Sequence, residues 1–207
     1  TIRYEDICED YRGCRFFKIC PMDYEVDLDL VKRLYADGKV VFVDLGGYGG
    51  ATSDKRYSVE TEYGHDVIHT LCRNSTIIKA SAEDLLSILP GRTAEEAAQY
   101  LVDAGAKTVV VTLGSKGAFY KRGNTDPTYF GPAPAKSEEP NGQFDFTGAG
   151  DSFGAGFMAS YVRHQDLDQA VRNGNATASL VIQRSGGCTM SRMPSRERVE
   201  RRLTTGE

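Results

Sequence analysis

Residues 145–151, Asp-Phe-Thr-Gly-Ala-Gly-Asp, combine a turn of small residues with a carboxylate. The next segment, 152–162, is small and apolar, which predicts that the turn opens a helix. Glycine lets the backbone approach a ligand closely, and the first amide N–H groups of a helix have no acceptor within it. The amides of Gly148, Ala149 and Gly150 are therefore candidates to bind a phosphate or a developing oxyanion.

Asp151 would lie in the first turn of this helix, where the helix dipole favours a negative charge by roughly 0.3–1 kcal/mol. A carboxylate beside an anion-binding turn can accept the proton of an attacking hydroxyl while the amides neutralise charge on the transferring group. This combination suits phosphoryl transfer, which requires positioning, electrostatic stabilisation and a base. The alternative is an acid near an N-cap that only closes the helix. The stretch alone does not decide between the two.

Other phosphate-binding motifs are absent from the sequence. There is no GKS or GKT that could complete a Walker A loop, and no GxGxxG fingerprint follows a predicted strand. Gly154 and Gly156 fall inside the predicted helix instead, where small residues permit close packing against a neighbouring helix.

Composition limits the classes of function. The 207 residues suffice for one domain with a core, and 40% hydrophobic and 26% charged residues are ordinary for a globular protein. The net charge of −4 argues against a general nucleic-acid binder. The apolar runs are too short to span a bilayer, and the charged first ten residues do not resemble a signal peptide. We therefore expect a cytoplasmic protein without nucleic-acid or membrane partners; the start at Thr1 suggests a fragment or a processed chain.

The cysteines and histidines give weak signals. The five cysteines are Cys8, Cys14, Cys20, Cys72 and Cys188; the number is odd and no CxxC occurs, so free thiols are expected. His65 and His69 are four residues apart and would share a helix face. Because no third ligand is evident nearby, a metal site there is the less favoured interpretation.

The hydrophobic pattern alternates strands and helices. Strands are expected at 15–20, 39–45, 75–81, 107–114 and, antiparallel, 117–122; helices at 26–38, 62–72, 82–89, 94–105, 149–164, 167–184 and 195–203; and loops at 46–50 and 123–142. Thr93 and Glu96 form a predicted capping box. This alternation predicts an α/β protein with a mainly parallel sheet flanked by helices.

Ligands of such sheets bind beyond the carboxyl ends of the strands. Three of the predicted strands end in polar or glycine-containing segments, 44–46, 79–81 and 112–114. We therefore expect these segments to line one edge of the sheet.

The stretch DFTGAGDSFGAGFMASY (145–161) resembles the second signature of the ribokinase-like, or PfkB, carbohydrate kinase family. That signature is approximately D-T-x-G-A-G-D followed by small and apolar residues. Segments 75–85, 104–120 and 173–187 resemble further family stretches in the same order, so the resemblance covers almost the whole chain. It implies a Rossmann-like three-layer fold and an ATP- and Mg²⁺-dependent kinase that phosphorylates a hydroxyl of a sugar or sugar-like substrate.

The resemblance also implies residue roles. Asp151 would be the base that deprotonates the acceptor hydroxyl, and the 148–150 turn the anion hole. Asp145 would support a monovalent cation such as K⁺, with carbonyls near 184–187 as partners. The nucleotide would be bordered by Thr112, Gly114, Lys116, Gly117 and Asn175.

Two positions depart from the family pattern. Phe146 stands where Thr is usual, which alters the local turn. The N-x-x-E motif, which helps to organise Mg²⁺ around the phosphates, is Ser-Ala-Glu-Asp here. Ser81 and Asp84 would take the Asn and Glu places, and Glu83 could compensate for the shorter Asp84. The alternative is that Ser81 and Asp84 form a plain helix N-terminus.

Family members are longer at the N-terminus, so the resemblance implies that the first strands, the small β-lid and most sugar contacts are missing here. Residues 1–207 would then be a single α/β domain, the nucleotide-binding C-terminal portion of such a kinase. Relatives often dimerise, so a homodimer is possible. Three functions remain open: a sugar kinase, a nucleoside kinase, or a truncated non-catalytic nucleotide-binding protein.

Overall fold

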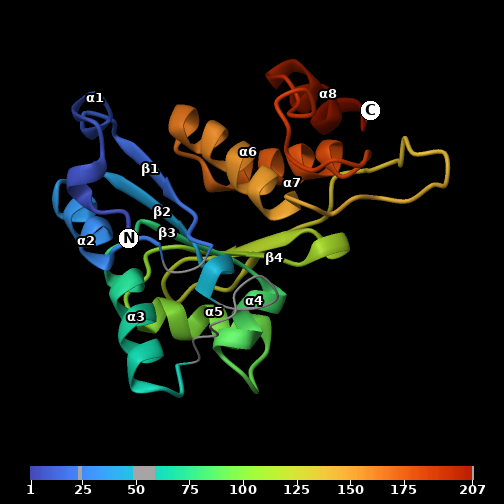
Figure 1. Ribbon diagram of the computed structural model, residues 1–207. Helices are drawn as coiled ribbons and strands as arrows, with labels where there is room; N and C mark the ends of the chain where they lie inside the picture. The colour runs from blue at the N-terminus through green and yellow to red at the C-terminus, as the bar shows by residue number, and fades with distance from the viewer. Residues whose placement is uncertain (23–24, 49–58, 207) are drawn as a thin grey trace. The chain divides into compact units, whose positions relative to one another are not determined.

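The computed structural model describes residues 1–22, 25–48 and 59–206. Its contacts divide the chain into two compact units (Figure 1). The first unit comprises Thr1–Thr112 and Tyr120–Thr128, and the second comprises Leu113–Phe119 and Tyr129–Glu207.

The strands form a mainly parallel sheet, as the sequence predicts. They are β1 (Phe16–Ile19), β2 (Val40–Asp44), β3 (Ile77–Ser81), β4 (Val109–Thr112), β5 (Ala118–Lys121) and β6 (Thr128–Phe130), in the order β1-β2-β3-β4-β5-β6. Neighbours among β1 to β4 pair in parallel. The prediction of a loop over 123–142 was wrong where β6 lies, because a three-residue strand is too short to show an alternating pattern.

The core of the first unit follows from runs of β-branched and aromatic residues. Val41, Phe42 and Val43 are completely buried on β2, although successive side chains of a strand point to opposite faces. The three valines that begin β4 are equally buried. A strand buried on both faces belongs in the interior of a parallel sheet, which explains why these segments lack polar alternation.

The helices of the first unit are α1 (Glu9–Arg12), α2 (Leu28–Ala36), α3 (Glu62–Arg73), α4 (Ala82–Ile88) and α5 (Ala94–Asp103), with 3₁₀ turns η1 (Tyr4–Asp6) and η2 (Leu45–Tyr48). From α2 to α5 each begins at a polar N-cap whose side chain accepts a backbone N–H: Asp27, Thr61, Ser81 and Thr93. The Thr93–Glu96 capping box is confirmed. Residues 46–48 belong to η2 rather than to the predicted loop, whose last two residues lie outside the described part.

In the second unit, η3 (Gly114–Lys116) precedes three helices, α6 (Ala149–His164), α7 (Leu167–Val181) and α8 (Arg196–Thr205). Glycines let α6 and α7 pack closely, as the sequence predicts. A Cβ on Gly156 would lie 2.2 Å from Thr177 Oγ1, and one on Gly174 would lie 2.8 Å from the Phe153 ring. Any side chain at these glycines would separate the two helices.

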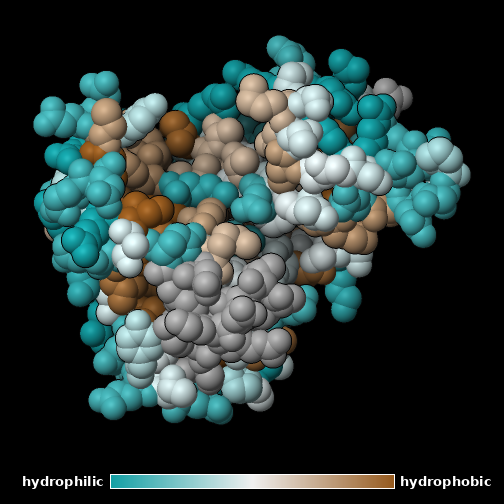
Figure 2. Space-filling model, in the orientation of Figure 1, coloured by the Kyte–Doolittle hydropathy of each residue, from teal (hydrophilic) through white to brown (hydrophobic). Residues whose placement is uncertain are grey.

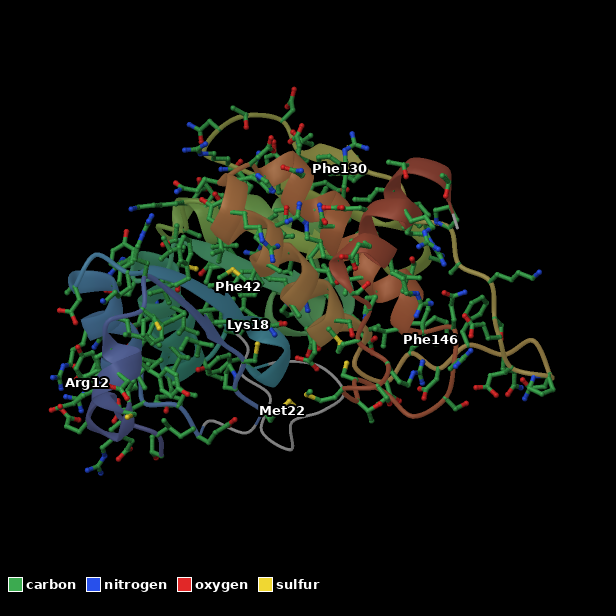
Figure 3. All side chains as sticks on the ribbon, turned by 90° about the horizontal axis from the view of Figure 1, so that it is seen from above. Arg12, Lys18, Met22, Phe42, Phe130 and Phe146 are labelled. Carbon is green, nitrogen blue, oxygen red and sulfur yellow. The ribbon has the colours of Figure 1, made fainter. Side chains whose placement is uncertain are left out.

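The surface is mixed in polarity. Hydrophobic side chains reach the visible face around β1 (Figure 2), and the exposed apolar residues of the first unit include Ile2 and Met22. In the second unit, Phe146 lies in the loop before α6 and is 67% exposed (Figure 3). Among the residues that the structure describes, no helix has the length and apolar character that crossing a membrane requires.

Candidate active site

The N-cap of α6 is Gly148, in the left-handed conformation with φ of 72°. Non-glycine residues rarely adopt this conformation. A Cβ at Gly148 would also lie 2.3 Å from Cys188 Sγ, far inside van der Waals contact. The position therefore requires glycine for two independent reasons, backbone conformation and space. Gly148 also provides no side-chain oxygen, so α6 begins without a side-chain cap.

The amides of this turn differ in what they bind. The Ala149 N–H donates to the Phe146 carbonyl at 3.0 Å, so it is engaged inside the turn. The first intrahelical bond runs from the Ser152 N–H to the Gly148 carbonyl at 2.9 Å. The Gly150 and Asp151 N–H groups come before that bond and have no acceptor within the helix. They are aligned with the positive end of the α6 dipole.

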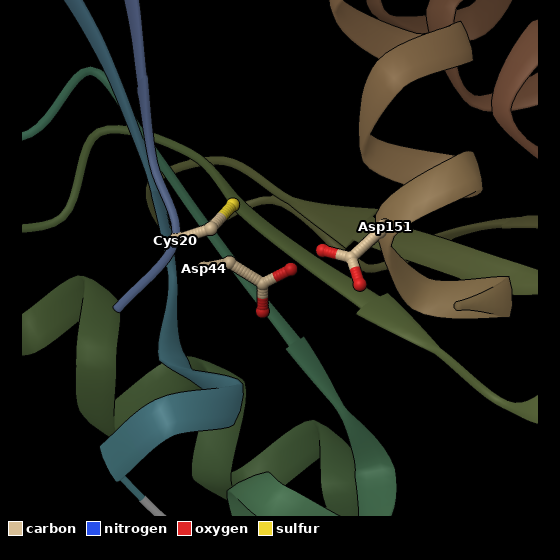
Figure 4. A group of neighbouring side chains, drawn as sticks. All are labelled: Cys20, Asp44 and Asp151. Carbon is tan, nitrogen blue, oxygen red and sulfur yellow. The ribbon is translucent and has the colours of Figure 1, made fainter. Parts of the chain in front are cut away.

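Asp151 lies in the first turn of α6 and is exposed, while the neighbouring Ser152 is almost wholly buried (Figure 4 shows Asp151 on the helix). The carboxylate thus stands at the N-terminus of α6, beside amides that precede the first intrahelical hydrogen bond. The helix begins where the sequence predicts it, with Asp151 in its first turn. The Ala149 amide, one of the three predicted anion donors, is engaged within the turn.

Asp145 joins the loop before α6 to the loop after α7. Its Oδ1 accepts the Thr147 N–H at 2.9 Å and its Oδ2 accepts the Gly186 N–H at 2.7 Å. The hydrogen bonds from Thr147, with that from Gly186, hold the pKa of the Asp145 carboxyl well below its usual range. The same loop is held by Glu139, which accepts the Ser185 N–H at 2.6 Å. The structure therefore brings Asp145 to the 184–187 segment, whose carbonyls were expected to share a monovalent cation with it. The observed contact is with the Gly186 N–H, and the cation stays a prediction.

The residues of the second unit that were predicted to border the nucleotide form a turn that a backbone hydrogen bond stabilises. Gly114 and Gly117 have positive φ of 58° and 90°, and the Leu113 N–H donates to the Gly117 carbonyl at 2.7 Å. A Cβ on Gly117 would lie 2.1 Å from the Phe130 carbonyl oxygen. Lys116 is exposed at the end of η3.

Asn175, on α7, was expected to border the nucleotide. Its Nδ2 donates to the Gly131 carbonyl at 3.0 Å, so the amide fixes the backbone directly after β6. This is the same segment that packs against Gly117, since a Cβ there would lie 2.6 Å from the Gly131 carbonyl carbon. Asn175 and Gly117 are thus connected through one short stretch of backbone.

In the first unit, the carboxyl ends of the strands meet as predicted. The registers pair Asp44 with Lys79 and Ser81 with Thr112. Lys79 Nζ lies 2.9 Å from Asp44 Oδ2, and both side chains are almost wholly buried. Burial of such a pair requires each charge to compensate the other. Cys20 follows β1 at the same edge, with its Sγ within 4.8 Å of an Asp44 carboxylate oxygen (Figure 4).

Ser81 is the N-cap of α4. Its hydroxyl donates to Asp84 Oδ2 at 2.6 Å and accepts the Asp84 N–H at 3.0 Å. Burial raises the pKa of the Asp84 carboxyl above its usual range, against the opposing effects of the Ser81 hydrogen bond and the Lys79 charge. Carboxylate and hydroxyl oxygens are ligands that suit Mg²⁺, and a desolvated carboxylate gains from a nearby cation. Ser81 and Asp84 therefore fit a magnesium site; Glu83 is exposed.

Sequence reasoning missed two groups of residues. The first is the buried Asp44–Lys79 pair. The sequence contained a signal for it, because Asp44 ends one apolar strand and Lys79 interrupts the next. Only the strand register shows that the two residues are neighbours. Cys188 was expected only as a free thiol. Its contact with Gly148 joins positions 40 residues apart, which no local pattern indicates.

The histidines that were weighed as a metal pair stack instead. The ring centroids of His65 and His69 are 3.9 Å apart. His69 Nε2 lies 2.9 Å from the Tyr100 hydroxyl, and desolvation lowers the pKa of His69. A neutral ring that bonds a tyrosine suits a structural contact between α3 and α5.

Comparison with known proteins shows which family the chain resembles. Residues 51–195 match the pfkB family carbohydrate kinases. A protein named cytidine kinase from Thermococcus kodakarensis is 32% identical over 180 residues, which cover 87% of this chain and 59% of that protein.

Solved structures agree at the level of fold. A ribokinase from Arabidopsis thaliana, complexed with ribose and ATP, has a TM-score of 0.72 and 22% identity over 96% of this chain and 60% of its own. An Escherichia coli protein whose structure holds ATP and Mg²⁺ has a TM-score of 0.74 and 23% identity over 97% of this chain and 62% of its own. The chain thus spans about 59–62% of the length of these relatives. With the family match extending over most of the sequence, the chain belongs to the PfkB family of carbohydrate kinases, in which sugar and nucleoside kinases share the ribokinase-like fold.

Proposed function

We propose that the protein is an ATP-dependent kinase that transfers the γ-phosphoryl group to a hydroxyl of a sugar or sugar-like acceptor. The observation that carries the proposal is the N-terminus of α6. Gly148 opens the helix without a side-chain cap, and Asp151 stands in its first turn beside amides that have no intrahelical acceptor. Family membership supports the same chemistry.

In this proposal Asp151 accepts the proton of the acceptor hydroxyl as the acceptor oxygen bonds to the γ-phosphorus. The bond between that phosphorus and the bridging oxygen of ADP breaks, and ADP leaves. The amides at the start of α6 stabilise the negative charge of the phosphoryl oxygens. A positioned base contributes roughly 10²–10⁴ in rate, and the amides contribute a comparable factor.

Ser81 and Asp84 would hold Mg²⁺, because their oxygens and the half-buried setting of Asp84 suit a divalent cation. When bound, Mg²⁺ neutralises phosphate charge.

The turn of Gly114, Lys116 and Gly117, with Thr112 before it, would border the nucleotide. Asn175 would act there through the backbone of Gly131. Asp145 would hold the two loops that flank the α6 turn, and a monovalent cation beside it remains a prediction, as do a homodimer and a cytoplasmic location.

A nucleoside acceptor is the second candidate. It is favoured by one observation, the 32% identity to a protein named cytidine kinase over 87% of this chain. The same α6 turn would serve it, because a ribose hydroxyl is an alcohol like that of a free sugar. The two candidates differ in the acceptor and share the catalytic residues.

The test is ADP release from Mg-ATP by this chain over a panel of pentoses, hexoses, sugar phosphates and nucleosides, with acceptor-free and ATP-free reactions beside each. We expect release that depends on one acceptor, and mass spectrometry should find that acceptor 80 Da heavier, the mass of the added HPO₃. Release with a nucleoside alone would select the second candidate. Binding of ATP without release for any acceptor would contradict the proposal and favour a non-catalytic nucleotide-binding protein.

A further inference from the structure

Cys188 contacts the α6 turn through two polar groups. Its Sγ lies 3.0 Å from the Gly148 carbonyl oxygen, to which the thiol donates. It also lies 2.9 Å from the Ser152 hydroxyl oxygen. Because the thiol proton is directed to Gly148, the hydroxyl of Ser152 donates to the sulfur.

These contacts bear on the first intrahelical bond of α6. The Gly148 carbonyl that accepts the thiol also accepts the Ser152 N–H. Cys188 therefore binds both residues that this bond joins. The sulfur also occupies the space where a Gly148 side chain would lie, 2.3 Å from an ideal Cβ.

The loop that carries Cys188 is itself held in place. The Gly186 N–H donates to Asp145, and the Ser185 N–H donates to Glu139. Arg192 donates to the carbonyls of Ser185 and Val181. A thiol on a braced loop can fix the backbone that it contacts, whereas one on an unsupported loop would follow it.

We infer that Cys188 is a positioning residue for phosphoryl transfer, which holds the Gly148 carbonyl and thereby the direction of the amides that follow it. The inference rests on the proposed function of the α6 turn. Cys188 need not touch the reacting atoms: its effect is exerted through Gly148 and Ser152. Loss of the donor should lower kcat while the KM values for ATP and acceptor stay the same, because the geometry matters most in the transition state.

The experiment compares three variants. Cys188→Ala removes the donor without adding bulk, Cys188→Ser keeps a donor, and Cys14→Ala removes another exposed thiol, which is not among the proposed site residues. We measure kcat and KM, and hydrogen–deuterium exchange of the peptide 146–153, which does not depend on activity. For Cys188→Ala we expect kcat to fall about 3- to 10-fold, as for loss of one hydrogen bond, and exchange to rise several-fold. Cys188→Ser should restore both, and Cys14→Ala should match the parent.

Two results would overturn the inference. In one, Cys188→Ala behaves like Cys14→Ala in both exchange and kcat. In the other, Cys188→Ser is as impaired as Cys188→Ala, which would make packing rather than donation responsible. If the parent chain releases no ADP, the proposed function fails, while the exchange of the 146–153 peptide still decides whether the thiol holds the turn.

Discussion

Helices α6 and α4 both begin at predicted site residues, and their first turns are built in opposite ways. The α6 turn begins with Gly148, which has no side-chain oxygen to offer. The α4 turn begins with Ser81, whose hydroxyl accepts the Asp84 N–H and donates to the Asp84 carboxylate. The α6 helix therefore begins without a side-chain cap, and the α4 helix begins with a cap from its own N-cap residue.

The difference shows how a helix N-terminus acquires a function. A polar N-cap stabilises a helix by about 1 kcal/mol because it satisfies an amide. Gly148 lacks this side-chain cap, and in the proposed function the amides of its turn bind the phosphoryl group. The Ser81 cap instead holds Asp84, whose burial raises its pKa. The proposed function assigns a phosphate to the first turn and a cation to the second.

Gly148→Ala should disrupt the α6 turn, and we expect it to have a larger effect than the substitutions in the α4 turn. The new Cβ would collide with Cys188 Sγ and strain a residue with positive φ. We expect kcat to fall by roughly 10²–10³, the loss typical of a disrupted oxyanion-type site. Steady-state kinetics measure it.

Gly38→Ala is the matched control, because Gly38 has nearly the same φ, 73°, and nothing lies within 4 Å of its Cβ position. The control introduces the backbone strain without the collision. If Gly38→Ala lowered kcat as much as Gly148→Ala, strain rather than the geometry of the α6 turn would explain the loss.

Asp84→Asn tests the first turn of α4. The variant keeps the size of the side chain and removes the charge that suits Mg²⁺. We expect the Mg²⁺ concentration for half-maximal ADP release to rise on the order of 10- to 100-fold, as when groups that support a metal site are removed. Glu83→Gln, at the exposed neighbour, should leave it unchanged. The opposite pattern would give the metal role to Glu83.

Asp84→Asn also tests how the free energy of unfolding depends on pH. Because the folded pKa of Asp84 is raised, the folded state holds this proton more firmly than the unfolded state. The free energy of unfolding should therefore fall as pH rises from the ordinary pKa to the raised one, in the absence of Mg²⁺. Asp84→Asn should lack this decrease, so urea melts of the two proteins should show the parent losing stability relative to the variant. A parent that gained relative stability over this range would contradict the raised pKa.

Ser81→Ala and Thr93→Ala form the pair with the smallest expected effect. Each removes a side-chain N-cap, and each should lower the free energy of unfolding by about 1 kcal/mol. Only Ser81→Ala should also raise the Mg²⁺ requirement, because Thr93 caps a helix outside the proposed site. Equal Mg²⁺ dependence in the two variants would make Ser81 a plain cap.

The sequence predicts the fold where the pattern is long and local. Residues 149–164 read as a helix and form α6, and the Thr93–Glu96 box caps α5. The small residues inside α6 indicate close packing, and Gly156 meets α7. Segment β6 could not be predicted, because three residues show no period.

The site could be predicted only in part. The sequence places Gly148 and Asp151 in one turn, because residues 148–151 form a short continuous stretch. The contacts of Cys188 with Gly148 and of Asn175 with Gly131 join residues 40 and 44 positions apart. Such contacts depend on how loops are placed by the packed helices, and neither residue type nor spacing indicates them.

The most direct measurement is the effect of Asp151→Asn on kcat and, separately, on the Kd of Mg-ATP. Asp168→Asn is the matched control, because Asp168 also lies in the first turn of a helix. We expect Asp151→Asn to lose roughly 10²–10⁴ in kcat with little change in Kd, and Asp168→Asn to retain both. Near-full turnover in Asp151→Asn would contradict the claim that Asp151 is the base of a kinase.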